Sequence, residues 1–508
     1  MMGYNITSKS QMAKNSLLLY IRTFITIIIS IYASRITLLK LGEDDFGIFT
    51  AVGGIAIIFG FLGSSFFSAT QRYLTMAIVS NKPDEYKKVF TTTIQCYIVL
   101  SLLVLIFGET VGLYIVNYIL NFSPDKTIAA NIVYQFSLIT LVLGLTNLPY
   151  KASIIAHEKY SYYAYIDVII KILRLLILFL LFLAPNQKLI LYSGLYTLVS
   201  LFNNIIDKIY CYFRFPECRF IKVWDKQMFL EITKFSTYSI FQKSAETVSN
   251  QGNNILINVF GGIIASASFG LANQVWGTLI SFFMNVQTAF SPQITKSYGA
   301  GDLKRFNNLI LNSCKISSYL VIFLSIPLIV NMPLVMSIWL TDVPQYATDF
   351  CLIVVFSAFI GALSNPLSTA IIAVGKIKRY QIITSLFYFI SLPISYLLLD
   401  YGIALIAVFV VRIFCQVVAM IYSGLYLARL TPFESKHYFF DCCLSSLSLI
   451  IGIVIPRFIQ LNIHINEYLI AIISSLIGEI LFISIIFKFG LSTIQRTRIK
   501  LFILSKLK

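Results

Sequence analysis

Apolar runs of membrane-spanning length recur along the whole sequence, and short polar segments separate them. A run of about 18 residues with few charges predicts a transmembrane helix, because such a helix can cross the hydrocarbon core of a bilayer. Fourteen segments fit this pattern, at residues 17–39, 46–68, 89–107, 131–154, 162–184, 189–212, 234–260, 263–289, 311–331, 348–371, 380–399, 402–426, 437–456 and 468–488. The pattern predicts an all-α polytopic membrane protein with about 14 transmembrane helices.

The seventh predicted helix departs from the uniformly apolar pattern. On a helical wheel its apolar residues Phe241, Val248 and Ile255 share one face, and polar residues occupy the opposite face. These polar residues are Ser236, Ser239, Lys243, Glu246, Asn250, Asn254 and Asn258. Polar groups at membrane depth are costly unless they face water or partner helices. We therefore expect this helix to line a hydrated cavity; the alternative is a polar face that joins helices in a static bundle.

Composition supports a membrane protein and argues against nucleic-acid binding. The chain has 508 residues, of which 58% are hydrophobic and 12% are charged. The net charge of +17 comes from basic residues scattered among short loops rather than gathered in one patch. If the N-terminus is cytoplasmic, the outside loops carry four basic residues, Lys40, Lys126, Lys188 and Arg457. The other basic residues of the loops and tails then lie on the inside. By the positive-inside rule, this excess of basic residues in the inside loops predicts that both termini are cytoplasmic.

The cysteines and histidines form no pattern typical of a metal site. The eight cysteines lack CxxC or metal-ligand spacing, and the three histidines, His157, His437 and His464, are far apart in the sequence. No catalytic motif or phosphate-binding glycine loop is present in the sequence either. We therefore expect no metal and no cofactor beyond a coupling ion.

An internal repeat predicts two lobes. Several short motifs recur in the same order in both halves: Phe46-Gly47-Ile48 as Phe269-Gly270-Leu271, and Asn147 with Pro149 as Asn365-Pro366. Six helices in each half would give both copies the same orientation in the membrane, as in transporters that rock about a central cavity. The predicted parts are an N-terminal six-helix lobe at 1–215, an amphipathic cytoplasmic linker at 216–233, a C-terminal six-helix lobe at 234–430, and two extra helices with a basic tail at 431–508.

Charged residues inside the predicted helices are the candidate site. Asp167, Lys171 and Arg174 lie at i, i+4 and i+7 of the fifth helix, and Arg22 lies on the polar face of the first. Unpaired charge at membrane depth is costly and typical of a functional site, although an intrahelical pair of Asp167 with Lys171 is the simpler alternative. The predicted substrate-binding residues are Arg22, Lys171, Arg174, Lys243, Asn250, Asn254, Gln274 and Asn285, and Glu246 and Asp167 are candidates for binding a proton or Na⁺.

Five stretches of the sequence resemble a known family. They are LGEDDFGIFTAVGG (41–54), SFFSATQRYL (65–74), FGLANQV (269–275), SPQITKSYGAGD (291–302) and NPLSTAIIAVGKIKRYQ (365–381). They resemble the polysaccharide-transporter branch of the multidrug/oligosaccharidyl-lipid/polysaccharide exporter superfamily, and the likeness spans essentially the whole chain. The resemblance implies two six-helix lobes, often with two added helices, and flipping of a polyprenyl-diphosphate-linked oligosaccharide from the inner to the outer leaflet of a bacterial inner membrane.

The resemblance also implies the partners. These are the lipid-linked oligosaccharide, membrane lipids and the polysaccharide polymerase machinery, in synthesis of O-antigen, capsule or exopolysaccharide, and we expect a monomer. Two alternative functions remain open. A multidrug exporter of the same superfamily would share the fold but favour an acidic cavity, and an enzyme acting on lipid-linked sugars would need a catalytic cluster or large external loops.

The charge asymmetry makes the topology testable. We expect Lys226 and Arg498 to be cytoplasmic and Asp342 to be external, because the basic loops stay inside. Single cysteines at these positions, in a background without the eight native cysteines, can be labelled in intact cells with a membrane-impermeant reagent. Labelling at position 342 alone is the expected result, and external labelling at position 226 would contradict the topology.

Overall fold

The computed structural model describes residues 9–80, 82–119, 126–183, 187–340, 343–462, 466–490 and 496–497. Asp342 and Arg498 lie outside these residues. Within the described ranges the chain forms helices and short connections and contains no strand. Nine of the described helices are long and apolar enough to cross a membrane. The prediction of an all-α, multi-pass membrane protein is therefore confirmed.

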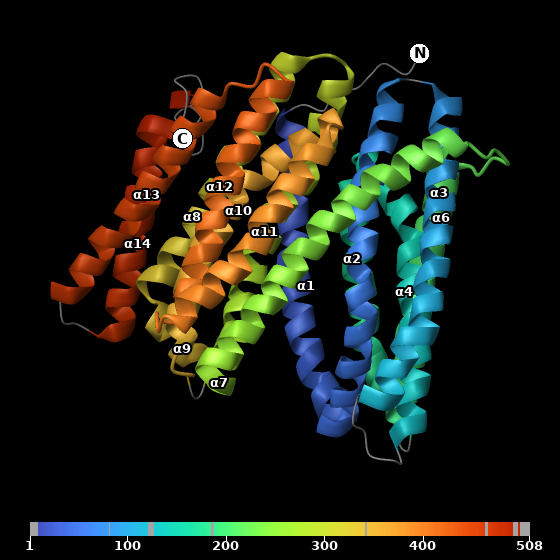
Figure 1. The fold of residues 1–508 in the computed structure, drawn as a ribbon, viewed down its shortest axis with the longest axis horizontal. Helices are drawn as coiled ribbons and strands as arrows, with labels where there is room; N and C mark the ends of the chain where they lie inside the picture. Colours follow the sequence, from blue (N-terminus) through green and yellow to red (C-terminus); the bar gives the residue numbers. More distant parts are fainter. Residues whose placement is uncertain are drawn as a thin grey trace, which may run out of the picture. The chain divides into compact units, whose positions relative to one another are not determined.

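The first part of the chain forms six long helices (Figure 1). Helix α4 packs against α2, α3 and α6, and α1 packs against α5. Their bounds are α1 Lys9–Leu41, α2 Glu43–Val79, α3 Pro83–Phe107, α4 Thr127–Ala156, α5 Tyr160–Leu176 and α6 Lys188–Arg214. Each of the first six predicted segments corresponds to one of these helices, and a 3₁₀ turn at Ile177–Leu183 extends α5.

The seventh and eighth predicted helices are two halves of one element. Helix α7 runs from Lys226 to Gly299 and is interrupted at Gly262, where φ is 73° and ψ is −171°. Only glycine adopts this backbone conformation without substantial strain. The predicted boundary between 260 and 263 therefore falls on the break. The helix begins within the predicted linker, because the Asp225 side chain accepts a hydrogen bond from the backbone N–H of Met228 and caps the N-terminus.

The remaining helices match the last six predicted segments and add one short helix. They are α8 Leu303–Val330, α9 Met332–Trp339, α10 Ala347–Val374, α11 Ile377–Asp400, α12 Ala407–Leu430, α13 Ser435–Asn462 and α14 Glu467–Ile485. Helix α10 packs against α8 and α12, and the pair α13 and α14 packs against α8. A Cβ atom added at Gly478 would lie 2.6 Å from the carbonyl oxygen of Gly452, so glycine lets these two helices approach closely. The eight-residue α9 lies between the predicted helices at 311–331 and 348–371, in a region predicted to be a loop.

The chain divides into two compact units. Unit 1 comprises Met1–Ser244, Thr288–Asp302 and Gly375–Gln381, and unit 2 comprises Ala245–Gln287, Leu303–Val374 and Ile382–Lys508. Two short segments from the second half of the sequence thus pack with the first half. The predicted lobe boundaries at 215 and 430 stay a prediction.

The internal repeat has a conformational counterpart. Helices α4 and α10 each contain an internal proline, Pro149 and Pro366, and each ends in a turn with one residue at positive φ. That residue is Glu158 after α4, at φ 59°, and Gly375 after α10, at φ 89°. They are 217 residues apart, as are Pro149 and Pro366. The two halves therefore share a backbone turn as well as a sequence pattern, although the first half uses a residue for which this conformation is unfavourable.

Substituting Gly262 tests the break in α7. Gly262→Ala forces an alanine into a conformation that costs about 1–3 kcal/mol, so we expect a lower free energy of unfolding. The matched control is Gly270→Ala in the same helix, where φ is not positive and no atom would lie within 4 Å of the added Cβ. This control should be neutral or stabilising by about 0.5–1 kcal/mol. Thermal unfolding of both variants in detergent measures the difference, and equal midpoints would contradict a required glycine.

Candidate functional site

Four charged residues of unit 1 form what we call the cationic cluster: Arg22, Asp167, Lys171 and Arg174. Arg22 lies on α1, and the other three lie on consecutive turns of α5, which packs against α1. Electrostatic interactions link Lys171 to the other three residues. The structure thus brings together three of the predicted substrate-binding residues and one of the two predicted ion-binding residues.

Asp167 forms an ion pair with Arg22 of the neighbouring helix α1. Its Oδ2 atom lies 3.6 Å from Nε of Arg22, and the two side chains are 37% and 16% exposed, respectively. The Asp167–Lys171 pair within α5 was the simpler alternative to a substrate site. In the structure the packing of α1 against α5 gives Asp167 an ion pair with Arg22, and Lys171 interacts with Asp167 electrostatically. At about 4 Å, and an effective dielectric of about 20, such a pair gains about 4 kcal/mol before desolvation is subtracted.

Aromatic rings flank both arginines of the cluster. The Arg22 guanidinium carbon lies 5.0 Å from the centre of the Tyr163 ring, and that of Arg174 lies 4.1 Å from the centre of the Tyr196 ring. Arg174 also donates to Oγ of Ser200 at 3.3 Å. A ring face attracts a cation without neutralising it. With Lys171 protonated, the charges of these four residues alone, three cations and one carboxylate, sum to +2.

Unit 2 contains a buried arginine of its own. Arg412 on α12 is 8% exposed and donates to Oδ1 of Asn250 at 2.9 Å. Its guanidinium carbon lies 5.0 Å from the centre of the Trp276 ring, and the carboxylate of Glu246 interacts with it electrostatically. The sequence alone did not indicate which residues contact Arg412. Asn250, predicted to bind substrate, is here an acceptor for an arginine.

The polar face of α7 makes hydrogen bonds to neighbouring helices. In unit 1 Gln381 donates to Oγ of Ser239 at 2.9 Å, and in unit 2 Arg412 donates to Oδ1 of Asn250 at 2.9 Å. The apolar residues on the other face are exposed; Val259, for instance, is 69% exposed. Interhelical hydrogen bonds therefore account for part of the polar face, as in the alternative of a static bundle. The hydrated cavity stays a prediction.

The remaining predicted residues differ in exposure. Lys243 and Gln274 are exposed, Asn254 is half-buried, and Asn285 is 4% exposed. Lys243 belongs to unit 1, and the other three belong to unit 2. Their role in substrate binding stays a prediction.

Sequence analysis missed Asp207, a buried carboxylate on α6. It is 2% exposed and accepts hydrogen bonds from Nδ2 of Asn147 at 2.7 Å and from the Tyr162 hydroxyl at 3.0 Å. These donors lie on α4 and α5, so one acidic side chain joins three helices of unit 1. An acidic residue within the apolar run of 189–212 was the available signal.

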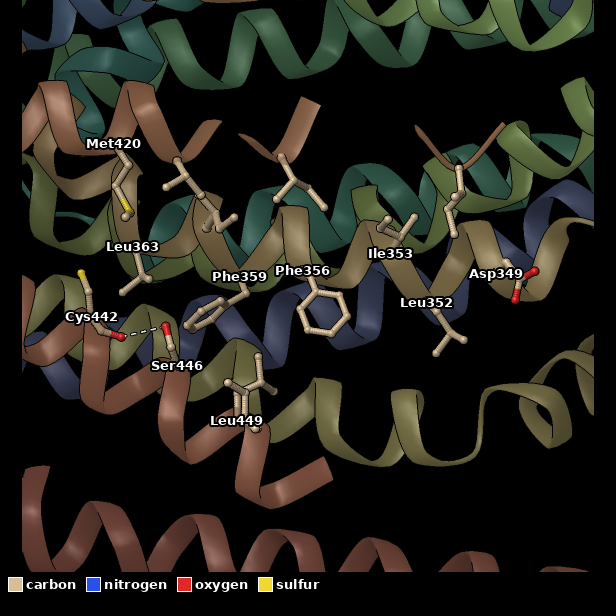
Figure 2. A pocket seen from close by; sticks show the side chains of 15 residues that line it. Asp349, Leu352, Ile353, Phe356, Phe359, Leu363, Met420, Cys442, Ser446 and Leu449 are labelled. Atoms are coloured by element: carbon tan, nitrogen blue, oxygen red, sulfur yellow. Dashed lines mark hydrogen bonds between the residues drawn. The ribbon is translucent and has the colours of Figure 1, made fainter. Parts of the chain in front are cut away.

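A cavity of about 560 Å³ lies within unit 2, between α10, α12 and α13 (Figure 2). Its lining is apolar, with side chains such as Phe356, Phe359 and Leu449, and Asp349 lies at one end. None of the predicted site residues is among the described residues that line it. Its chemistry suits hydrocarbon rather than a charged group. Elsewhere in the described residues, no group of three or more His, Cys, Asp or Glu side chains could hold a metal ion.

Comparisons with known proteins identify the fold. Residues 239–397 match the MatE family. A crystal structure of a MATE protein in the bent conformation has a TM-score of 0.71 and 12% identity, covering 82% of this chain and 96% of that one. A superfamily transporter from Pyrococcus furiosus, described as having a binding pocket of reverse polarity, has a TM-score of 0.69 and 11% identity, covering 84% of this chain and 99% of that one.

A third solved structure is the MATE transporter ClbM in complex with Rb⁺, with a TM-score of 0.67 and 16% identity, covering 85% of this chain and 97% of that one. No curated protein sequence matches the chain significantly. At these identities the likeness shows the fold: this chain has the fold of MATE transporters of the same superfamily as the resemblance found in the sequence.

Neutralising Asp167 tests whether its carboxylate stabilises the cationic cluster. Asp167→Asn leaves three cations close together, so we expect the free energy of unfolding to fall by about 1–2 kcal/mol. Adding Lys171→Gln should restore part of this loss, because it removes one repulsive charge. The matched control is Asp84→Asn, whose pair with Lys87 is exposed and should contribute little. Unfolding in detergent measures all three, and a loss no larger than that of the control would refute the role.

Proposed function

We propose that this protein is a transporter that flips a polyprenyl-diphosphate-linked oligosaccharide from the inner to the outer leaflet of a bacterial inner membrane by alternating access. The observation that carries the proposal is the cationic cluster of Arg22, Lys171 and Arg174 around a single carboxylate. An excess of positive charge on membrane helices is costly, and a diphosphate is the kind of group that would offset it.

The chemistry of the cluster suits a phosphate ligand. Burying a bare ion in hydrocarbon costs tens of kcal/mol in the Born limit, so a charged headgroup needs a polar, hydrated path. Guanidinium groups bind phosphate oxygens in bidentate fashion, whereas a lysine acts as a point charge. We assign the diphosphate to Arg22, Lys171, Arg174 and Lys243, and the sugar hydroxyls to Asn250, Asn254, Gln274 and Asn285. The lipid tail stays in the bilayer throughout.

Multidrug export is the second candidate, and a specific observation favours it. One of the solved structures that share the fold is an outward-facing multidrug resistance MATE transporter. Organic cations, however, call for acidic binding residues, and the cationic cluster has the opposite sign. The relative from Pyrococcus furiosus, with its pocket of reverse polarity, indicates that one fold accommodates both signs of charge.

The membrane potential is the simplest energy source for an anionic substrate. Moving two negative charges outward across an inside-negative potential releases about 2.3 kcal/mol per charge per 100 mV. Resetting the empty transporter is assigned to a proton or Na⁺ bound at Glu246 or Asp167. The proposal places both termini in the cytoplasm and includes the polymerase machinery as a partner of a monomeric transporter.

Transport by purified protein in liposomes tests the proposal. A lipid-linked oligosaccharide is supplied on one leaflet, and an impermeant lectin detects its appearance on the other. We expect Arg22→Lys and Arg174→Lys to slow flipping about tenfold although charge is retained, because lysine cannot replace a bidentate contact. Arg457→Lys is the matched control, since this arginine of unit 2 contacts a backbone carbonyl and Gln460 and lies outside the cationic cluster.

Three outcomes separate the candidates. Flipping of an unaltered substrate that depends on Arg22 and Arg174 supports the proposal. Transport of an organic cation without flipping of the sugar lipid would establish the drug exporter instead. A covalently changed product would establish an enzyme.

A further inference from the structure

The connection between α6 and α7 is fixed against α3 rather than extended into solvent. The backbone N–H of Ile221 donates to Oγ1 of Thr91 at 3.1 Å, and Nε2 of Gln95 donates to the carbonyl oxygen of Val223 at 3.0 Å. A Lys88–Asp225 ion pair of 2.8 Å completes the attachment. Lys88, Thr91 and Gln95 lie on one side of α3, so these contacts hold residues 221–225 against that helix. We call residues 213–226 the strip.

Buried contacts hold the start of this connection. The Phe215 ring stacks on the His157 imidazole with centroids 4.0 Å apart, and Nε2 of His157 lies 2.9 Å from Oε1 of Glu217. The hydrogen bond with His157 lowers the pKa of Glu217. Sγ of Cys218 lies 3.0 Å from Oγ of Ser153 inside the same layer. The position of the following residues is therefore set by packing.

The outward side of the strip combines large apolar and basic side chains. Phe213 is 79%, Phe220 is 55% and Trp224 is 60% exposed. The basic residues Arg214, Arg219, Lys222 and Lys226 are also exposed. Both acidic residues of the strip already have partners, since Glu217 contacts His157 and Asp225 pairs with Lys88. The outward charge is consequently positive.

The contacts with α3 also give the level of the strip relative to the bilayer. Val223 is bonded to Gln95, and one turn further along α3 the apolar residues Ile98 and Val99 are 47% and 41% exposed. Because α3 belongs to a helix long and apolar enough to cross a membrane, we place these two residues against lipid. This placement puts Trp224 at the level of the boundary between headgroups and hydrocarbon, where tryptophan is favoured.

We propose that residues 213–226 form a binding surface for anionic phospholipid headgroups, with Phe220 and Trp224 inserted at the boundary and Arg219, Lys222 and Lys226 contacting the phosphates. Each basic side chain near an anionic leaflet contributes an attraction that decays within a Debye length. The apolar rings determine how deeply the surface inserts into the bilayer, and the basic residues determine its preference for anionic lipid. This inference is independent of the transported substrate.

Fluorescence of Trp224 tests the surface directly. The full chain has three tryptophans, so Trp276→Phe with Trp339→Phe leaves Trp224 as the only reporter. This protein is reconstituted in zwitterionic vesicles that contain a small fraction of phospholipid brominated near the top of its acyl chains, with either an anionic or a zwitterionic headgroup. We expect the anionic brominated lipid to quench Trp224 about fivefold more effectively at low salt, which is the preference that one basic residue near the surface contributes. This preference should vanish at about 1 M salt, because salt screens the attraction.

Charge-removal variants separate the two parts of the proposal. Arg219→Gln with Lys222→Gln and Lys226→Gln should abolish the preference while Trp224 stays quenched equally by both lipids. The matched control neutralises three exposed lysines elsewhere, Lys82, Lys304 and Lys436, and should keep the preference. Equal quenching by both lipids in the unmodified surface would overturn the headgroup assignment. Absence of quenching would overturn contact with lipid and point to a protein partner.

Discussion

The cost of holding charge away from water governs the arrangement of these helices. Three arginines of the membrane-length helices each have local partners: a carboxylate and a ring for Arg22, a hydroxyl and a ring for Arg174, and an amide and a ring for Arg412. Rings and neutral acceptors stabilise a guanidinium without cancelling its charge. These contacts stabilise the packed helices and leave the charge of Arg22 and Arg174 in place, which is the charge that the proposed anionic substrate would meet.

Periodicity was sufficient to predict the helices, because length and apolar content are local properties of a chain. The interruption of α7 at Gly262 also falls at the predicted boundary between the seventh and eighth helices, where two consecutive glycines follow the polar stripe. Periodicity could not identify the partners of charged residues. Asp167 had Lys171 one turn away in sequence, yet its partner came from α1, because pairing between helices depends on which faces pack. The same limit explains why the sequence did not reveal the partners of Arg412. It also explains why Asp207, an acidic residue flanked by apolar residues, was not predicted to join helices.

Helix α7 illustrates why a polar stripe is ambiguous. Hydroxyl and amide groups satisfy one another across helices in the same way as they would bind water or sugar. Ser239 and Asn250 are hydrogen-bonded to residues of neighbouring helices, and Lys243 is exposed while Asn254 is half-buried. One stripe thus contains buried packing residues and solvent-exposed residues, and only the arrangement of the helices distinguishes them.

The turn after α4 has a consequence for how the fold responds to perturbation. Glu158 holds a left-handed conformation that its counterpart Gly375 adopts freely, and its carboxylate is buried against Lys296 at 2.5 Å and Gln293. A strained backbone persists only while surrounding contacts over-determine it. Backbone hydrogen bonds from Glu158 to Ile155 and from Lys159 to Ile154 form the turn, and the contacts of the carboxylate with Lys296 and Gln293 offset its strain. Loss of Lys296 therefore removes a contact that compensates an unfavourable backbone conformation in the first half of the repeat, whereas Gly375 in the second half adopts its conformation without that cost.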